Sequence, residues 1–236
     1  MKKPKFVNNE IYHIYNRGVE KRNIFLDDDD YFRFIHDIFE FNDENPAENI
    51  YYKLSRIKSY EVQPRKIKKG EREARKLLVE ILTFCLMPNH FHLLLRQRKD
   101  KGIIKFMHKL GTGYTMSFNQ RRERVGPLFQ GRFKAVLIQQ DSHLIHIPYY
   151  IHLNPLDLKY PEWKNTEIKN FRGALKFLET YRWSSYQDYI GKKNFPSVTQ
   201  RDFLSKFFGG PGQYKKDTIN WIREFSFEEI KDFILE

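Results

Sequence analysis

The sequence predicts an α+β or α/β sandwich in which helices pack against a sheet, and three observations carry this prediction. Between residues 11 and 154, segments that alternate like strands are followed by segments with the 3.6-residue period of helices. The chain has 236 residues, 40% of them hydrophobic, so it can bury a core without covalent links. Its single cysteine excludes a disulfide framework and every multi-cysteine zinc ribbon or finger.

The first strand and the first helix are expected before residue 42. Residues 11–15 alternate and carry β-branched and aromatic side chains, and the sequence NRG at 16–18 predicts a turn after them. The acidic run Asp27–Asp30 then precedes residues 31–41, which have helical periodicity. Carboxylates are favourable at a helix N-terminus, so we interpret the run as capping rather than as a metal site.

The next elements follow in the same alternating order. Residues 77–96 predict a strand or a strand pair that is interrupted by Pro88 and Asn89, and residues 101–123 carry a helical apolar stripe. Residues 134–140 predict another strand. A further helix is expected from Ser142 to Leu153, where Asn154 and Pro155 end it.

Two parts of the chain are expected to differ in organisation. We predict one domain over residues 8–157 and a mostly helical extension over 158–236, with helices at 169–190, 199–207 and 217–235 and a break at 208–213. Residues 43–76 look like an inserted arm, because positions 53–76 hold ten Lys or Arg against three Glu. This arm is either a solvated surface or a phosphate-binding segment.

The overall charge points to a polyanionic partner. Lys and Arg exceed Asp and Glu by 42 − 30 = 12, and 16% of the residues are aromatic. A basic, aromatic-rich globular chain is typical of nucleic-acid binding. No apolar run approaches the roughly 18 to 20 residues that span a bilayer, and the first residues do not resemble a signal peptide. We therefore expect a cytoplasmic protein with no membrane partner.

The sequence His90-Phe91-His92 is the first candidate site. In a strand both imidazoles project from one face, while Phe91 and the alternate residues after it project from the other. Two adjacent imidazoles can hold a divalent cation. The triplet by itself is weak, because two ordinary sheet histidines would have the same spacing. Cys85 is expected on the face of Phe91, as a small buried hydrophobe rather than a nucleophile.

The predicted helix before Asn154 supplies the second candidate group. His146, Tyr150 and Asn154 are spaced by four residues and lie along one stripe, so Tyr150 and Asn154 can face the same site. His152 should point elsewhere. A tyrosine beside a metal site is a possible nucleophile, since a cation or a base favours its phenolate. From periodicity alone, a core tyrosine is the simpler interpretation. Pro148 lies inside this helix and should bend it.

Four motifs in order carry a resemblance to a known family. They are FCLMPNHFHLLL at 84–95, GPLFQGRFKAVLI at 126–138, YIHLNP at 150–155 and YRWSSYQDYIG at 181–191. Together they resemble the single-tyrosine HUH transposases, and more narrowly the REP-associated tyrosine transposases. The segment at 11–31 also resembles the usual opening of that family.

The resemblance implies a fold, a reaction and site residues. The fold is a mainly antiparallel sheet with helices packed on its faces, a ferredoxin- or RRM-like sandwich. His90 and His92 would hold Mg²⁺ or Mn²⁺, and Asn154 falls where relatives place a third ligand. Tyr150 would attack single-stranded DNA, at hairpin-forming repeats, to give a 5′-phosphotyrosine. Rejoining then needs no nucleotide cofactor, because the energy of the broken bond is retained.

The residues support the same partner and metal. Two imidazoles and an amide oxygen leave positions for phosphate oxygen and water, as Mg²⁺ or Mn²⁺ requires. Single-stranded DNA suits a surface of rings and cations. Candidate DNA contacts, each of which is otherwise a solvated charge, are Arg17, Lys21, Arg22, Arg96, Arg132 and Lys134.

Other functions compete with the transposase hypothesis. A domesticated hairpin-DNA-binding protein without cleavage is one alternative, and a rolling-circle or conjugative nickase with the same chemistry is another. A small-molecule HxH metallohydrolase is more distant, because it leaves the charge of +12 unexplained. The oligomeric state stays open: in some relatives a homodimer exchanges the tyrosine helix, and in others one chain builds the site.

Overall fold

A computed structural model describes residues 4–45, 75–139, 141–165 and 167–224 of the chain. In this part of the chain the strands form one antiparallel sheet with the order β2-β3-β1-β4. The strands are Ile11–Arg17 (β1), Val79–Met87 (β2), His90–Gln97 (β3) and Lys134–Ile138 (β4). With one helix after β1 and one after β3, the chain follows the β-α-β-β-α-β ferredoxin-like arrangement. The α+β class with an antiparallel sheet is therefore confirmed.

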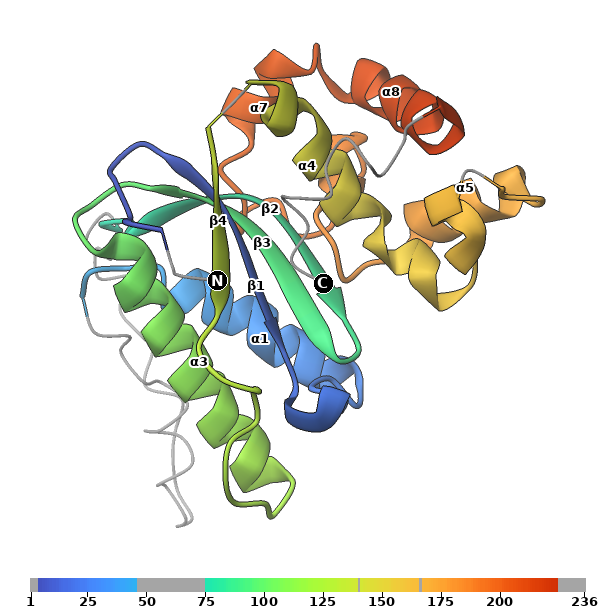
Figure 1. Cartoon of the computed structure of the whole chain (residues 1–236). Coiled ribbons are helices and arrows are strands. Elements are labelled where there is room, and N and C mark those ends of the chain that lie inside the picture. Colours follow the sequence, from blue (N-terminus) through green and yellow to red (C-terminus); the bar gives the residue numbers. More distant parts are fainter. Residues whose placement is uncertain (1–3, 46–74, 140, 166, 225–236) are drawn as a thin grey trace, which may run out of the picture.

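Helices cover both faces of the sheet. Helix α1 (Asp28–Glu40) and helix α3 (Gly102–Arg121) pack with alternate residues of β3, namely Phe91, Leu93 and Leu95. The opposite face, which includes Leu94, packs with α4 (Asp141–Leu153) and the segments after it. In Figure 1 α4, α5, α7 and α8 gather together, away from α1 and α3. The predicted sandwich of helices against a sheet is thus formed by two separate apolar layers.

The acidic run before α1 has the capping role that its sequence predicts. The side chain of Asp27 accepts a hydrogen bond from the backbone N–H of Asp30 at 3.0 Å. Asp27 and Asp30 also pair with Arg122 at 2.6 and 2.8 Å, which joins the start of α1 to the end of α3. These contacts give Asp27 and Asp30 a structural role at the start of the helix.

The hairpin between β2 and β3 corrects one sequence-based expectation. Cys85 pairs with His92 and packs in the same cluster as Leu94, so it lies on the face opposite to Phe91. The reason is the two-residue turn at Pro88 and Asn89, which pairs Met87 with His90 and so shifts the alternation by one residue. Cys85 is fully buried, as expected, and burial raises the pKa of its thiol well above the usual value.

The segments after α4 do not follow the predicted helix limits. The expected helix at 169–190 is divided into α5 (Phe171–Thr180) and α6 (Tyr186–Tyr189), because the residues between them run along β2. Helix α8 (Pro211–Glu224) begins inside the expected break at 208–213, since proline is well tolerated in the first turn of a helix. The other helical segments are η1 (Val19–Lys21), η2 (Asn154–Leu158), η3 (Pro161–Asn165) and α7 (Asp202–Phe207).

Some expectations lie outside the described residues. They include most of the inserted arm at 43–76 and the end of the helix expected at 217–235. The domain boundary expected between residues 157 and 158 stays a prediction. In the described part of the chain, none of the helices is long and apolar enough to cross a membrane.

Candidate active site

The two histidines of the HxH motif lie together on one face of the central strand β3. Their ring centroids are 5.0 Å apart, with the rings nearly perpendicular. His90 is 6% exposed and His92 is fully buried. The Nδ1 atom of His90 is 2.6 Å from the side-chain oxygen of Asn89, in the hairpin turn, which makes Nε2 the candidate ligand atom of His90. The strand alternation predicted from sequence is confirmed at this position.

A third imidazole belongs to the same cluster and was not recognised from the sequence. His13 of β1 is fully buried, and its Nε2 atom lies 2.9 Å from Nδ1 of His92. Sheet order places β1 beside β3, and the alternation of residues 11–15 turns His13 and Tyr15 toward the HxH face. That alternation was the available signal, but only the strand order shows which strand is the neighbour.

Tyr150 of α4 contacts these histidines from the opposite layer. Its ring centroid is 5.7 Å from that of His92 and 6.0 Å from that of His13, both in edge-to-face geometry. Tyr150 is fully buried. The structure therefore brings together the tyrosine and the histidine that the sequence paired, with both side chains fully buried.

Asn154 begins η2, directly after the tyrosine helix. Its side-chain Nδ2 donates to the backbone oxygen of Tyr150 at 2.8 Å, so the amide is held against the last turn of α4. Asn154 is fully buried. Its Oδ1 atom is one of the buried acceptors that have no hydrogen-bond partner among the described residues.

The donor set fits a divalent cation. In the described part of the chain, Nε2 of His92 is also buried without a hydrogen-bond partner, as is Oδ1 of Asn154. Buried polar atoms without partners are costly unless they bind something. Among all the residues that the structure describes, no group of three His, Cys, Asp or Glu side chains has a geometry that could hold a metal ion. A cation would therefore depend on imidazole nitrogens, an amide oxygen and ligands from substrate or water.

Burial keeps His92 neutral, as a metal ligand must be. The pKa of His92 is well below its usual value, first because of burial and then because of His90 and His13 nearby. A neutral imidazole has one nitrogen lone pair available for coordination.

Two histidines of α4, His146 and His152, point away from this cluster. His152 contacts the Ser185 hydroxyl at 2.8 Å and the Tyr214 hydroxyl at 2.7 Å. This confirms that His152 does not share the orientation of Tyr150. His146 accepts from the indole of Trp221 at 3.2 Å, so the stripe drawn through His146, Tyr150 and Asn154 does not turn His146 to the site.

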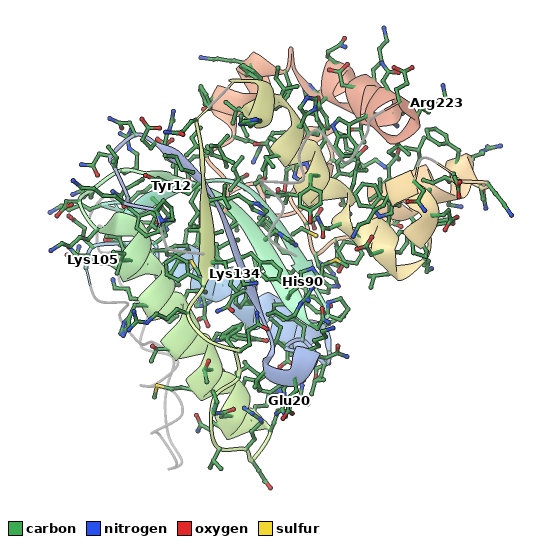
Figure 2. The ribbon with its side chains drawn as sticks, in the orientation of Figure 1. Tyr12, Glu20, His90, Lys105, Lys134 and Arg223 are labelled. Carbon is green, nitrogen blue, oxygen red and sulfur yellow. The ribbon has the colours of Figure 1, made fainter. Side chains whose placement is uncertain are left out.

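Two of the candidate DNA contacts, Arg17 and Lys134, lie near the histidine cluster. The guanidinium of Arg17 lies 5.4 Å from the ring centre of Tyr15, and the ammonium of Lys134 lies 5.7 Å from it. Tyr15 itself contacts the rings of His90 and His92, at 5.5 and 5.0 Å. Figure 2 labels His90 on β3 and Lys134 on β4, the strands on either side of β1.

The remaining candidates are more distant or already paired. Arg96 is at the other end of β3, where it pairs with Glu80 and stacks on Phe203 at 4.7 Å. Arg22 pairs with Glu20 at 3.2 Å. Lys21 is exposed in η1, and Arg132 is exposed just before β4. The structure thus groups Arg17 and Lys134 with the histidines and separates Arg96 from them.

Comparisons with known proteins found a family model and a solved structure that are similar to this chain. Residues 51–154 match the family model described as Transposase IS200 like. A solved structure of a REP-associated tyrosine transposase bound to a REP hairpin aligns with a TM-score of 0.48 and 14% identity, over 84% of this chain and 89% of that chain. No curated protein matches the sequence. The matched range includes His90, His92, Tyr150 and Asn154.

Proposed function

We propose that this protein is a metal-dependent transposase that cleaves and rejoins single-stranded DNA at hairpin-forming repeats. The observation that carries the proposal is the contact of the Tyr150 ring with the ring of His92, at 5.7 Å, inside the range that matches the IS200-like transposase model. The contact joins a candidate nucleophile to a candidate metal ligand from another layer of the fold. Among the described residues, Nε2 of His92 and Oδ1 of Asn154 lie buried beside it without a hydrogen-bond partner.

In this proposal Tyr150 is the nucleophile. Its phenolic oxygen forms a bond to the phosphorus of a DNA phosphodiester, and the bond from phosphorus to the 3′ oxygen breaks. The phenol loses its proton, and the leaving oxygen takes one up as a free 3′-OH. The 5′-phosphotyrosine that results retains the bond energy. Attack by a 3′-OH on this linkage reverses the step, joins a strand and restores the phenol.

His90, His92 and Asn154 would hold the cation. When bound, Mg²⁺ or Mn²⁺ polarises a non-bridging phosphate oxygen and orients the phosphodiester. His92 is held neutral by burial, and Asn154 is held by its hydrogen bond to the backbone oxygen of Tyr150. The amide contact links the third candidate ligand directly to the helix of the nucleophile.

Binding of the DNA strand is assigned to the cations and rings beside this cluster. Arg17 and Lys134 flank Tyr15, which itself contacts both histidines. Cations attract backbone phosphates, and aromatic faces stack on unpaired bases. In this proposal the tyrosine acts on the site of its own chain, which the contact between the Tyr150 and His92 rings supports.

The test uses labelled single-stranded hairpin oligonucleotides from repeats flanking the gene, with Mg²⁺ or Mn²⁺, on a denaturing gel. We expect a protease-sensitive shifted band that needs the metal and is lost in Tyr150→Phe. The matched control is Tyr149→Phe, which changes the neighbouring tyrosine of the same helix, whose hydroxyl contacts Asp217 at 3.5 Å instead. A covalent band that persists in Tyr150→Phe would refute the assignment.

One observation favours a second candidate function. Tyr150 is fully buried, as expected for a protein that binds hairpins without cutting them. Tight, metal-independent binding of the same hairpins with no covalent band from any of them would support this domesticated DNA-binding function.

A further inference from the structure

The β2 edge of the sheet is covered by the polypeptide that follows α5. Strand β2 is an edge strand, and an edge strand offers unpaired backbone groups to other chains. Here these groups bond to residues between positions 181 and 200. Three are backbone bonds: Leu86 N donates to Trp183 O at 2.8 Å, Ser185 N to Phe84 O at 3.0 Å, and Gln200 N to Ile81 O at 2.9 Å. Two come from tyrosine hydroxyls: Tyr181 donates to Leu86 O at 2.6 Å, and Tyr189 to Leu82 O at 2.7 Å.

Ser185 connects this covering segment to the tyrosine helix. Its backbone and hydroxyl both bond to Phe84 of β2, with the hydroxyl oxygen 2.9 Å from the Phe84 nitrogen. The same hydroxyl lies 2.8 Å from Nε2 of His152. The imidazole of His152 is therefore attached to the sheet through one side chain, two residues after Tyr150.

The other ring nitrogen of His152 connects to a third element. Its Nδ1 atom is 2.7 Å from the hydroxyl of Tyr214 on α8. His152 and Tyr214 are both buried, at 0% and 1% exposure. A leucine in place of His152 would fill a similar volume and would bury no polar atoms of its own. The hydroxyls of Ser185 and Tyr214 would then each lose a hydrogen-bond partner.

A proline interrupts the backbone hydrogen bonds of α4 close to His152. Pro148 lies inside α4, and a proline has no N–H to donate to the preceding turn. The backbone of α4 is thus weakened two residues before Tyr150. His152 is one turn after Pro148, where a side-chain contact restrains the same stretch of helix.

We propose that His152 is a positioning residue, which holds the Tyr150 end of α4 to the sealed sheet edge and to α8 and so keeps the Tyr150 ring against His92. The inference rests on the proposed function for its catalytic consequence. It also gives residues 181–224 a role: they are part of the structure that places the nucleophile.

The experiment compares His152→Leu and His152→Gln in the full chain, because the glutamine amide can still donate and accept hydrogen bonds. The control is His36→Gln on α1, whose side chain is 57% exposed and lies on the other layer. The first measurement is hydrogen exchange of the peptide that covers residues 147–153. In His152→Leu we expect exchange of this peptide to be about ten-fold faster, because buried hydrogen bonds are lost. The exchange rates of β1 and β3 should stay unchanged.

The second measurement separates DNA binding from the covalent step. In His152→Leu, displacement of the nucleophile should slow adduct formation in a single turnover by about 100-fold, with the dissociation constant for DNA unchanged. His152→Gln should recover most of the rate, and His36→Gln should match the wild type.

The outcomes distinguish this proposal from the proposed function. Wild-type exchange in α4 and a wild-type adduct rate in His152→Leu would overturn the positioning role. Faster exchange across the whole sheet in both variants would also overturn it, because His152 would then only support folding. If the wild type forms no adduct, but α4 alone loses protection in His152→Leu, the attachment stands and the proposed reaction fails.

Discussion

The Nε2 atom of His13 lies 2.9 Å from the Nδ1 atom of His92, which joins the two central strands by a contact between fully buried imidazoles. A hydrogen bond at this distance needs one donor and one acceptor. If Nε2 of His92 offers its lone pair to a cation, its proton is on Nδ1, and His92 donates to His13. Partners of this kind orient a metal-binding imidazole and select its tautomer.

Replacing His13 should therefore weaken metal binding without removing a ligand. We expect His13→Phe to lower the affinity for Mn²⁺ by about 10- to 100-fold, because the ring that accepts from His92 loses its nitrogens. His13→Gln keeps an acceptor and should lose less. Calorimetric titration of the protein with Mn²⁺, without DNA, measures both. The control is His108→Gln, an exposed histidine of α3. Equal affinities for all of these proteins would contradict the role of His13.

The cations near Tyr15 should account for part of the salt dependence of DNA binding. Arg17→Gln and Lys134→Gln should each reduce the slope of log K against log salt by about 1, since each removes one phosphate contact. Arg96→Gln should leave the slope unchanged, because Arg96 pairs with Glu80 at the far end of β3. Fluorescence anisotropy with a labelled hairpin at several salt concentrations gives the three slopes. A larger effect of Arg96→Gln than of the other two would place the DNA elsewhere.

The tyrosine hydroxyls that cover the edge of β2 should contribute to stability. Tyr181→Phe and Tyr189→Phe each leave a buried carbonyl, of Leu86 or Leu82, without its partner. We expect each change to lower the free energy of unfolding by about 1 to 3 kcal/mol, measured by urea denaturation. The two losses should add in the double variant, because the contacts are separate. No loss from either change would mean that water replaces these hydroxyls.

Acid should destabilise the protein through His152. Burial lowers the pKa of His152 to about 3, whereas the unfolded chain binds its proton near the usual value of 6.5. The unfolded state thus holds more protons between these values, and stability falls as the pH decreases from 6.5 toward 3. This group contributes about 1.4 kcal/mol per pH unit in that range. His92 acts in the same direction.

The contribution of His152 is isolated by comparing slopes. Urea denaturation at pH 7, 6, 5 and 4 should show a shallower decrease for His152→Gln than for the wild type. The control His36→Gln, at a side chain that is 57% exposed, should keep the wild-type slope. Parallel decreases in His152→Gln and the wild type would contradict a neutral, buried His152.

Several features of the site followed from local sequence alone. The alternation around Phe91 put His90 and His92 on one face, and the acidic residue Asp27 marked the start of α1. Helical spacing separated His152 from Tyr150. Each of these depends on the period of one element or on a cap within one turn, so no knowledge of distant residues was needed.

Other features required the neighbours of each element. The face of Cys85 depended on the register of a hairpin turn, and the helix expected at 169–190 gave way where Trp183 and Ser185 bond to β2. The edge of β2, where Phe84 lies 101 positions before Ser185, offered backbone partners that helical propensity could not outweigh. Propensity describes one segment, whereas pairing depends on which segments meet.

The sequence by itself determined the class of fold, the two HxH histidines on one face and the tyrosine helix that follows. Only the tertiary structure decided that His13 adjoins His92, that Tyr150 is enclosed against both, and that His152 connects α4 to the sheet edge. The physical reason is that side-chain direction repeats within an element, while strand order and layer packing are set by burial of the whole core.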